Sequence, residues 1–198
     1  GGMRFSVTRD DIKRVTLRGN NGETLAGRVK VEFINGEPTV TDVIDAETEI
    51  TLTAPDGGCF EVGRYYYLVT LPVVFSKGMT FTMIADTQKG TIERTSQMQI
   101  KRSVFGGFAD ADTKTTFIDA IDFKDAGFKA YCVDHFDTDG NGEICVEETI
   151  PVTSIDVSGM KSGISLINSD LRRFQNLLIL NCSDMDLTEL DVTGLPIG

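Results

Sequence analysis

The chain lacks three features that would indicate a membrane-spanning, zinc-binding or hydrolytic protein. No apolar run approaches the roughly 20 residues that a transmembrane helix needs. No two cysteines stand in a C-x-x-C pair, which excludes the common thiolate zinc patterns. His135 is the only histidine, and no serine or cysteine near it stands in a recognisable nucleophile setting. The sequence therefore predicts no catalytic residue.

The ends and the cysteines carry little further information. Gly1 and Gly2 precede Met3 and are typical of a tag remnant, so the absence of a signal peptide does not indicate the native destination. The four cysteines allow three disulfide pairings in an oxidising compartment. We interpret them as small apolar side chains that fill the core, at Cys59, Cys132, Cys145 and Cys182.

The formal charge of −11 is confined to the second half of the chain. Residues 1–108 carry 13 basic and 13 acidic side chains, whereas residues 109–198 carry 6 and 17. This change in composition predicts a domain boundary near Ala109. An acidic half is repelled by phosphate backbones, so we expect no nucleic-acid partner and consider cations instead.

The first half has the pattern of a β protein. Apolar and polar residues alternate in short runs, and turn residues such as Asn35-Gly36 separate the runs. The runs are centred on Val15–Leu17, Val29–Phe33, Ile50–Leu52, Tyr65–Leu71, Phe81–Ala85 and Ile92–Val104. About seven short strands of this kind predict an antiparallel β-sandwich over residues 3–108, within a mainly β fold. We interpret Phe105–Phe108 as the linker that follows it.

A helix is predicted next, because apolar residues recur at three- and four-residue spacing up to Phe136. Asp122 is the expected N-cap, with Asp125 three residues later. The helix leads directly into residues 137–148, which fit the calcium-loop pattern D-x-[DN]-x-[DN]-G-x5-E at every defined position. Helix and loop together occupy residues 122–150.

The loop offers the oxygen ligands that calcium prefers. Side-chain oxygens are expected from Asp137, Asp139 and Asn141, a backbone carbonyl from Glu143, and two carboxylate oxygens from Glu148. In addition, Gly142 permits the sharp bend, and Ile144 is expected to anchor the loop in the core as a short β segment. We therefore predict one structural Ca²⁺ site.

Two neighbouring residues shape this prediction. Cys145 stands at the ninth loop position, where an oxygen side chain often holds a water, and a thiol is a poor partner for a hard cation. We therefore expect a dissociation constant of about 10⁻⁴–10⁻³ M. Pro151 limits the exit helix to about one turn, and no second loop is present, so the ion is expected to stabilise structure rather than to switch it.

Residues 151–198 contain a repeated frame of apolar, polar, apolar and hydroxyl-bearing residues, with another apolar residue three positions earlier. The frame occurs at Ile155–Ser158, Leu180–Ser183 and Leu190–Thr193, preceded by Val152, Leu177 and Leu187. This is the spacing of a leucine-rich repeat. Because so few repeats cannot enclose a core alone, we expect residues 112–198 to form one domain in which the helix and loop cap the repeats. The remaining acids here, such as Asp184 and Asp186, are interpreted as solvated turn residues.

Two stretches carry a resemblance to known families. Residues 15–27 and 67–81, with Tyr67-Leu68-Val69-Thr70-Leu71-Pro72, resemble the sandwich domain of fimbrillin-like (Mfa-like) surface proteins of Gram-negative bacteria. Residues 128–136, the calcium loop and residues 152–158 resemble the tails of BspA-like surface proteins, which combine a calcium loop with leucine-rich repeats.

The resemblance implies an exported protein of the cell surface or outer membrane, a lipoprotein with its lipid anchor upstream, used in adhesion or fimbria-type assembly. It transfers no catalytic residue. Two alternatives stay open. One is a docking module that recognises a surface protein or glycan, and the other is an accessory domain of a larger surface enzyme. The partner itself is not predicted.

Overall fold

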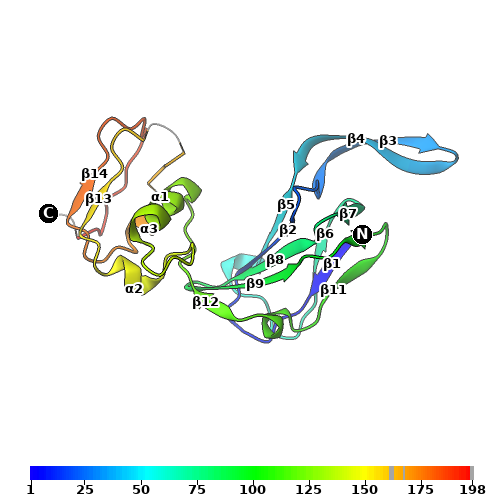
Figure 1. The fold of residues 1–198 in the computed structure, drawn as a ribbon, viewed down its shortest axis with the longest axis horizontal. Coiled ribbons are helices and arrows are strands. Elements are labelled where there is room, and N and C mark those ends of the chain that lie inside the picture. Colours follow the sequence, from blue (N-terminus) through cyan, green and yellow to red (C-terminus); the bar gives the residue numbers. More distant parts are fainter. Residues whose placement is uncertain (161–162, 167, 197–198) are drawn as a thin grey trace. The chain divides into compact units, whose positions relative to one another are not determined.

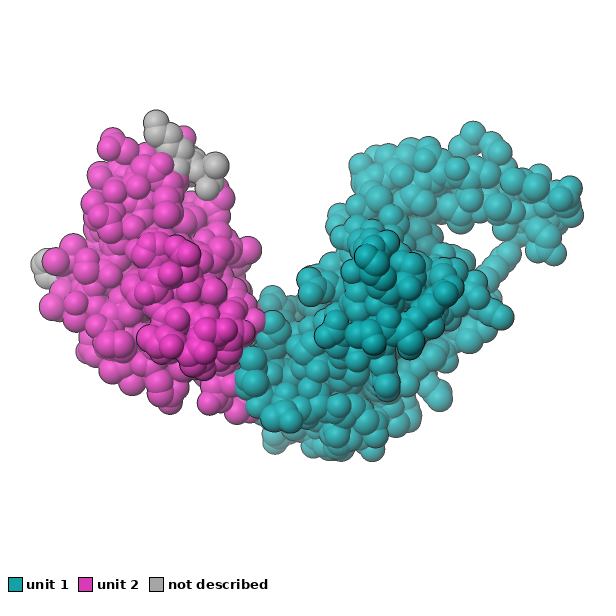
Figure 2. All heavy atoms as spheres, in the orientation of Figure 1, with its two compact units in different colours: residues 1–85, 89–118 teal, residues 86–88, 119–198 magenta. Residues whose placement is uncertain are grey.

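The computed structural model describes residues 1–160, 163–166 and 168–196 and is mainly β, with 37% of residues in strands and 13% in helices. The chain divides into two compact units, coloured separately in Figure 2. Unit 1 comprises residues 1–85 and 89–118, and unit 2 comprises residues 86–88 and 119–198. The division after Ile118 lies later than the change in charge near Ala109, because Ala111 is fully buried in the core of unit 1.

Unit 1 is built from four groups of paired strands (Figure 1). The largest is a five-stranded sheet in the order β12 (Phe117–Asp119), β9 (Gln88–Arg94), β8 (Met79–Ile84), β2 (Arg14–Gly19), β5 (Glu49–Thr53). A second sheet has the order β11 (Phe105–Phe108), β1 (Gly2–Phe5), β6 (Tyr66–Val69). Two further pairs are β10 (Met98–Ile100) with β7 (Val73–Phe75), and β3 (Ala26–Ile34) with β4 (Glu37–Glu47).

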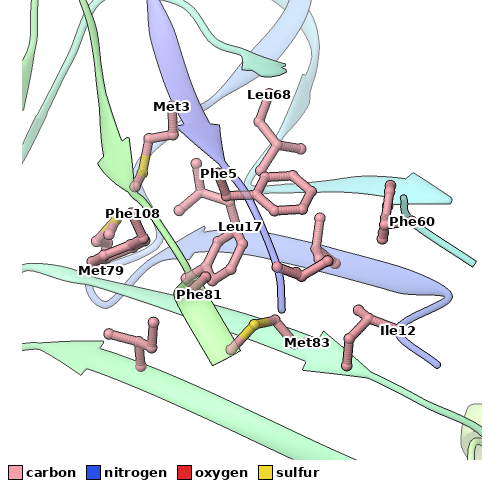
Figure 3. Close-up of a cluster of buried hydrophobic side chains, with 14 of the residues drawn as sticks. Met3, Phe5, Ile12, Leu17, Phe60, Leu68, Met79, Phe81, Met83 and Phe108 are labelled. Carbon is pink, nitrogen blue, oxygen red and sulfur yellow. The ribbon is translucent and has the colours of Figure 1, made fainter. Parts of the chain in front are cut away.

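The core of unit 1 includes side chains that alternate along strand β2 with a period of two residues. In β2, Val15 and Leu17 are fully buried, and they stand opposite Met83 and Phe81 of β8. The ring of Phe81 lies 5.4 Å from that of Phe5 in β1, so the five-stranded and three-stranded sheets share one set of buried side chains (Figure 3). Alternation therefore predicts which face of β2 is buried.

Residues 105–108 do not form the expected linker. They form strand β11, which pairs in parallel with β1, whereas purely antiparallel pairing was expected. Gly107 permits the pairing, because its φ is +155° and a Cβ there would stand 1.7 Å from the carbonyl oxygen of Arg4. Two glycines between two phenylalanines suggest a flexible joint, but here Gly107 allows two backbones to approach closely.

In unit 2 the core is surrounded by short elements: α1 (Ala126–Phe136), α2 (Val146–Thr149), α3 (Asn168–Leu171), β13 (Ser154–Asp156) and β14 (Ile179–Asn181). Strands β13 and β14 pair in parallel, with Ile155 opposite Leu180. These residues occupy equivalent positions of the repeated frame.

The second, polar residue of the repeated frame forms the same turn in each of the three copies. The side chains of Asp156, Asn181 and Asp191 each accept a hydrogen bond from the amide two residues on, at 3.0, 3.2 and 2.8 Å. Such bonds satisfy a backbone donor, which at Asp156 and Asn181 follows the end of a strand. The polar position of the frame therefore serves as a turn former in all three copies.

Candidate calcium site

Helix α1 leads into the loop, but it begins later than expected. The N-cap is Asp125, whose Oδ1 accepts a hydrogen bond from the Phe128 amide at 2.9 Å, and Asp122 lies before the helix. Asp122 instead pairs with Lys124 at 2.7 Å. The helix ends at Phe136, so Asp137 is both its C-cap and the first loop residue. The start of the loop is thus fixed directly by the helix.

The loop turns back on itself through two glycines with positive φ, Gly140 at +70° and Gly142 at +78°. Both of their amides donate to the carboxylate of Asp137, each at 2.8 Å. Asp139 in turn accepts from the Asn141 amide at 3.0 Å and from its side-chain nitrogen at 2.8 Å. These bonds direct the polar side chains of the loop toward its inside.

Three of the predicted ligands converge. One carboxylate oxygen from each of Asp137, Asp139 and Glu148 lies within 4.8 Å of the others. Carboxylate oxygens around a calcium ion stand 2.3–2.6 Å from it, so oxygens on opposite sides of the ion are separated by up to about 5 Å. The spacing therefore fits a single cation of this size.

The side chain of Glu148 is buried and held in place by hydrogen bonds from the loop. Only 6% of its surface is exposed, and its carboxylate accepts hydrogen bonds from the Thr138 amide at 2.7 Å, the Thr138 hydroxyl at 3.0 Å and the Cys145 amide at 2.9 Å. Burial opposes ionisation, but these bonds outweigh it and lower the pKa of Glu148. The group is therefore a carboxylate at neutral pH.

The other two predicted ligands have different surroundings. The side-chain oxygen of Asn141 accepts from the Glu143 amide at 2.8 Å. The Glu143 side chain is buried and binds the ammonium group of Lys129 on α1 at 2.5 Å. The carboxylate of Glu143 is thus engaged with the helix, and only its backbone carbonyl was expected to face the ion.

The end of the loop is held by one buried residue, Ile144, and does not form a β strand. Ile144 is fully buried, and its carbonyl accepts a hydrogen bond from the Ile121 amide at 2.7 Å. The short β segment expected there does not form within the described residues. Cys145 caps α2, a single turn that ends two residues before Pro151. One buried side chain and one backbone bond therefore fix the exit.

His135 lies in the last turn of α1, beside the ring of Tyr131. Its ring stacks on Tyr131 at 4.2 Å, and its Nδ1 lies 2.9 Å from the Tyr131 carbonyl oxygen. The four cysteines are free thiols, of which only Cys132 is buried. Burial raises the pKa of Cys132 to about 12, and the nearby carboxylates of Asp170 and Asp125 add to the effect, so it is not a thiolate nucleophile.

Sequence reasoning missed the residues that support the loop. Thr138 occupies a variable position of the pattern, yet it gives Glu148 two hydrogen bonds. Lys129 pairs with Glu143 across 14 residues of sequence, a distance at which no helical spacing rule applies. Neither contact has a signal in the sequence.

Comparisons with protein-family models, curated proteins and solved structures found no match. No helix among the described residues is long and apolar enough to cross a membrane.

Proposed function

We propose that residues 137–148 bind one Ca²⁺, which stabilises unit 2. The ligands are side-chain oxygens of Asp137, Asp139, Asn141 and Glu148 and the carbonyl oxygen of Glu143. The main support is the convergence of three carboxylates within 4.8 Å, with Glu148 buried and already hydrogen-bonded. A calcium ion would balance the negative charge of these three carboxylates, and oxygen ligands of this kind are the ones that it prefers.

Titration calorimetry tests the calcium site. We expect heat on adding calcium, one site per chain, and a dissociation constant of about 10⁻⁴–10⁻³ M. Magnesium is the matched control, since it is smaller, demands near-ideal octahedral geometry and is expected to bind more weakly here. Absence of heat with millimolar calcium, together with an empty loop in crystals grown with calcium, would contradict the proposal.

The wider role that we propose is that of a non-enzymatic module of the bacterial cell surface, used in adhesion or fimbria-type assembly. In this interpretation unit 1 is a fimbrillin-like β-sandwich, and unit 2 is a calcium loop that caps a short leucine-rich repeat. The shared core of two sheets supports the first assignment. The parallel pairing of Ile155 with Leu180 supports the second. Export and an upstream lipid anchor follow from the family resemblance alone.

Such a module is expected to bind without turnover. Nucleophilic catalysis needs a base within hydrogen-bond reach of the nucleophile, and the single histidine stacks on Tyr131. Purified protein screened against glycan and peptide substrates, with and without calcium, should give no product. The same protein on glycan and host-protein arrays should bind. Turnover that a single Asp or Glu substitution abolishes would show instead that the chain is an enzyme.

A shallow pocket beside the loop favours a second candidate function, the docking of a partner protein or glycan. It has a volume of about 370 Å³ and is lined by Phe136, Thr138, Glu148, Val152 and neighbouring residues. Because Glu148 also belongs to the candidate calcium site, a ligand seated here would depend on calcium. Array binding that EDTA abolishes would favour this docking role over calcium-independent adhesion.

A further inference from the structure

The fold brings one basic side chain to the acidic calcium loop. Residues 137–148 contain five acidic side chains and no basic one. Lys129 is the only lysine or arginine in residues 125–160. It belongs to α1, eight residues before the loop begins, and its ammonium group binds the carboxylate of Glu143 in the loop at 2.5 Å. One cation therefore lies against a loop that has none of its own.

This ion pair is partly removed from water. The side chain of Glu143 is 9% exposed and that of Lys129 is 30% exposed. Fully exposed ion pairs contribute little, because water and salt screen them. A carboxylate buried as deeply as that of Glu143 is costly unless a cation accompanies it. Lys129 therefore offsets the charge of Glu143 in a place where that charge is only partly screened.

The backbone of Glu143 is held by other contacts. Its amide donates a hydrogen bond to the side-chain oxygen of Asn141 at 2.8 Å. The next residue, Ile144, is fully buried, and its carbonyl oxygen accepts from the Ile121 amide at 2.7 Å. The carbonyl of Glu143, which is the expected ligand, is thus positioned from both sides without Lys129. The effect of Lys129 on calcium is accordingly expected to be electrostatic.

Both charges of the pair are close enough to act on an ion in the loop. The carboxylate and the carbonyl of Glu143 belong to one residue, so bond lengths limit their separation to about 7 Å. The ammonium group of Lys129 therefore lies within about 10 Å of that carbonyl oxygen. The Debye length is about 10 Å at 0.1 M salt and about 30 Å at 0.01 M. At low salt, Glu143 attracts a cation in the loop and Lys129 repels it.

We infer that Lys129 sets the calcium affinity of the loop, because it cancels the charge of Glu143. The ion is then held by the charges of Asp137, Asp139 and Glu148 alone, instead of by four carboxylates. Calcium loops differ in affinity according to the number of charges around the ion. The inference rests on the calcium site proposed above, and it adds an affinity-determining residue that lies outside the twelve-residue pattern.

Titration calorimetry at about 10 mM salt tests the inference with two substitutions of Lys129. Lys129→Met keeps an apolar stem and removes the charge, so it should bind calcium about tenfold more tightly than the wild type. Lys129→Arg keeps the charge and should stay within about twofold of the wild type. Lys101→Met is the matched control: it removes the same charge from an exposed position of unit 1 and should leave the affinity unchanged.

Glu143→Gln tests the other half of the pair. It leaves the charge of Lys129 near the loop without the carboxylate, so calcium should bind about tenfold more weakly. The double substitution removes both charges and should return the dissociation constant toward that of the wild type. At about 0.3 M salt the differences among the variants should shrink. If Lys129 only shaped the loop, Lys129→Met would instead weaken calcium binding, and the double substitution would not compensate.

Thermal unfolding in EDTA separates affinity from stability. Without calcium, Lys129→Met lacks an ion pair and should melt at a lower temperature than the wild type, although it binds calcium more tightly. A purely structural residue would lower both quantities together. A wild type that binds calcium, with Lys129→Met binding no more tightly, would overturn this inference alone. A wild type that gives neither heat nor a higher melting temperature with calcium would overturn the calcium site, and the inference with it.

Discussion

Glu148→Gln is expected to abolish the calcium-dependent stabilisation of unit 2 and to leave unit 1 unchanged. Glu148 is the one ligand that offers two oxygens, and the amide that replaces its carboxylate is neutral and binds calcium with one oxygen. An ion that binds only the folded state stabilises it by RT ln(1 + [L]/Kd). With a dissociation constant of 10⁻⁴–10⁻³ M and about 10 mM calcium, the loss is about 1.4–2.7 kcal/mol.

The measurement is thermal unfolding in calcium and in EDTA, combined with amide hydrogen exchange to separate the two units. In EDTA, Glu148→Gln should show a smaller loss, because the carboxylate also accepts hydrogen bonds from Thr138 and Cys145. Glu147→Gln is the control, since Glu147 is exposed and stands on the same turn of helix. An unchanged calcium response, or an equal loss in both units, would contradict the assignment.

The convergence of Asp137, Asp139 and Glu148 could be predicted from sequence because the three residues are close together in the chain. Twelve consecutive residues contain every position of the pattern, and the bend requires glycine at a known place. The turn at Asn35-Gly36 was predictable for the same reason, and the pairing of Ile34 with Glu37 confirms it. Local patterns of this length therefore predicted the turn and the convergence of the carboxylates, although not the β segment at Ile144.

Contacts between distant residues could not be predicted in this way. The parallel pairing of β1 with β11 joins residues about 100 positions apart, and no local pattern distinguishes it from a linker. Similarly, alternation in Val29–Phe33 predicts a strand with one apolar face but does not reveal what covers it. The sequence indicates the hairpin of β3 and β4 but not its extension beyond the sheets of unit 1.

The start of α1 is a case in which two residues satisfy the same local rule. Asp122 and Asp125 are both acceptable N-caps, and the acid three residues after Asp122 favours Asp122. The structure selects Asp125, because Asp170 binds the amides of Lys124 and Asp125 from 46 and 45 residues away. A tertiary contact therefore decides where the helix begins.

Asp170→Ala is accordingly expected to destabilise unit 2 more than the loss of calcium does. Asp170 is 1% exposed, and its carboxylate accepts from the Lys124 amide at 2.9 Å and the Asp125 amide at 2.8 Å. Removing it leaves two backbone donors without an acceptor, at about 1–3 kcal/mol each. We therefore expect a loss of about 3–4 kcal/mol in unfolding experiments.

Asp170→Asn and Ser169→Ala separate this effect from simple loss of volume. Asparagine keeps one acceptor oxygen and should cost about half as much as alanine, whereas Ser169 is exposed on the same helix and its substitution should be nearly neutral. The carboxylate of Asp125 in turn accepts hydrogen bonds from the amides of Phe128 and Leu166. When Asp170 no longer positions Asp125, protection of amides from hydrogen exchange should fall first at the start of α1 and around Leu166. An asparagine variant as stable as the wild type, with only the alanine variant destabilised, would mean that the side chain of Asp170 only fills space. Calcium added to Asp170→Asn should still raise its melting temperature, since the loop ligands are intact, and a lost response would mean that the position of α1 determines calcium binding.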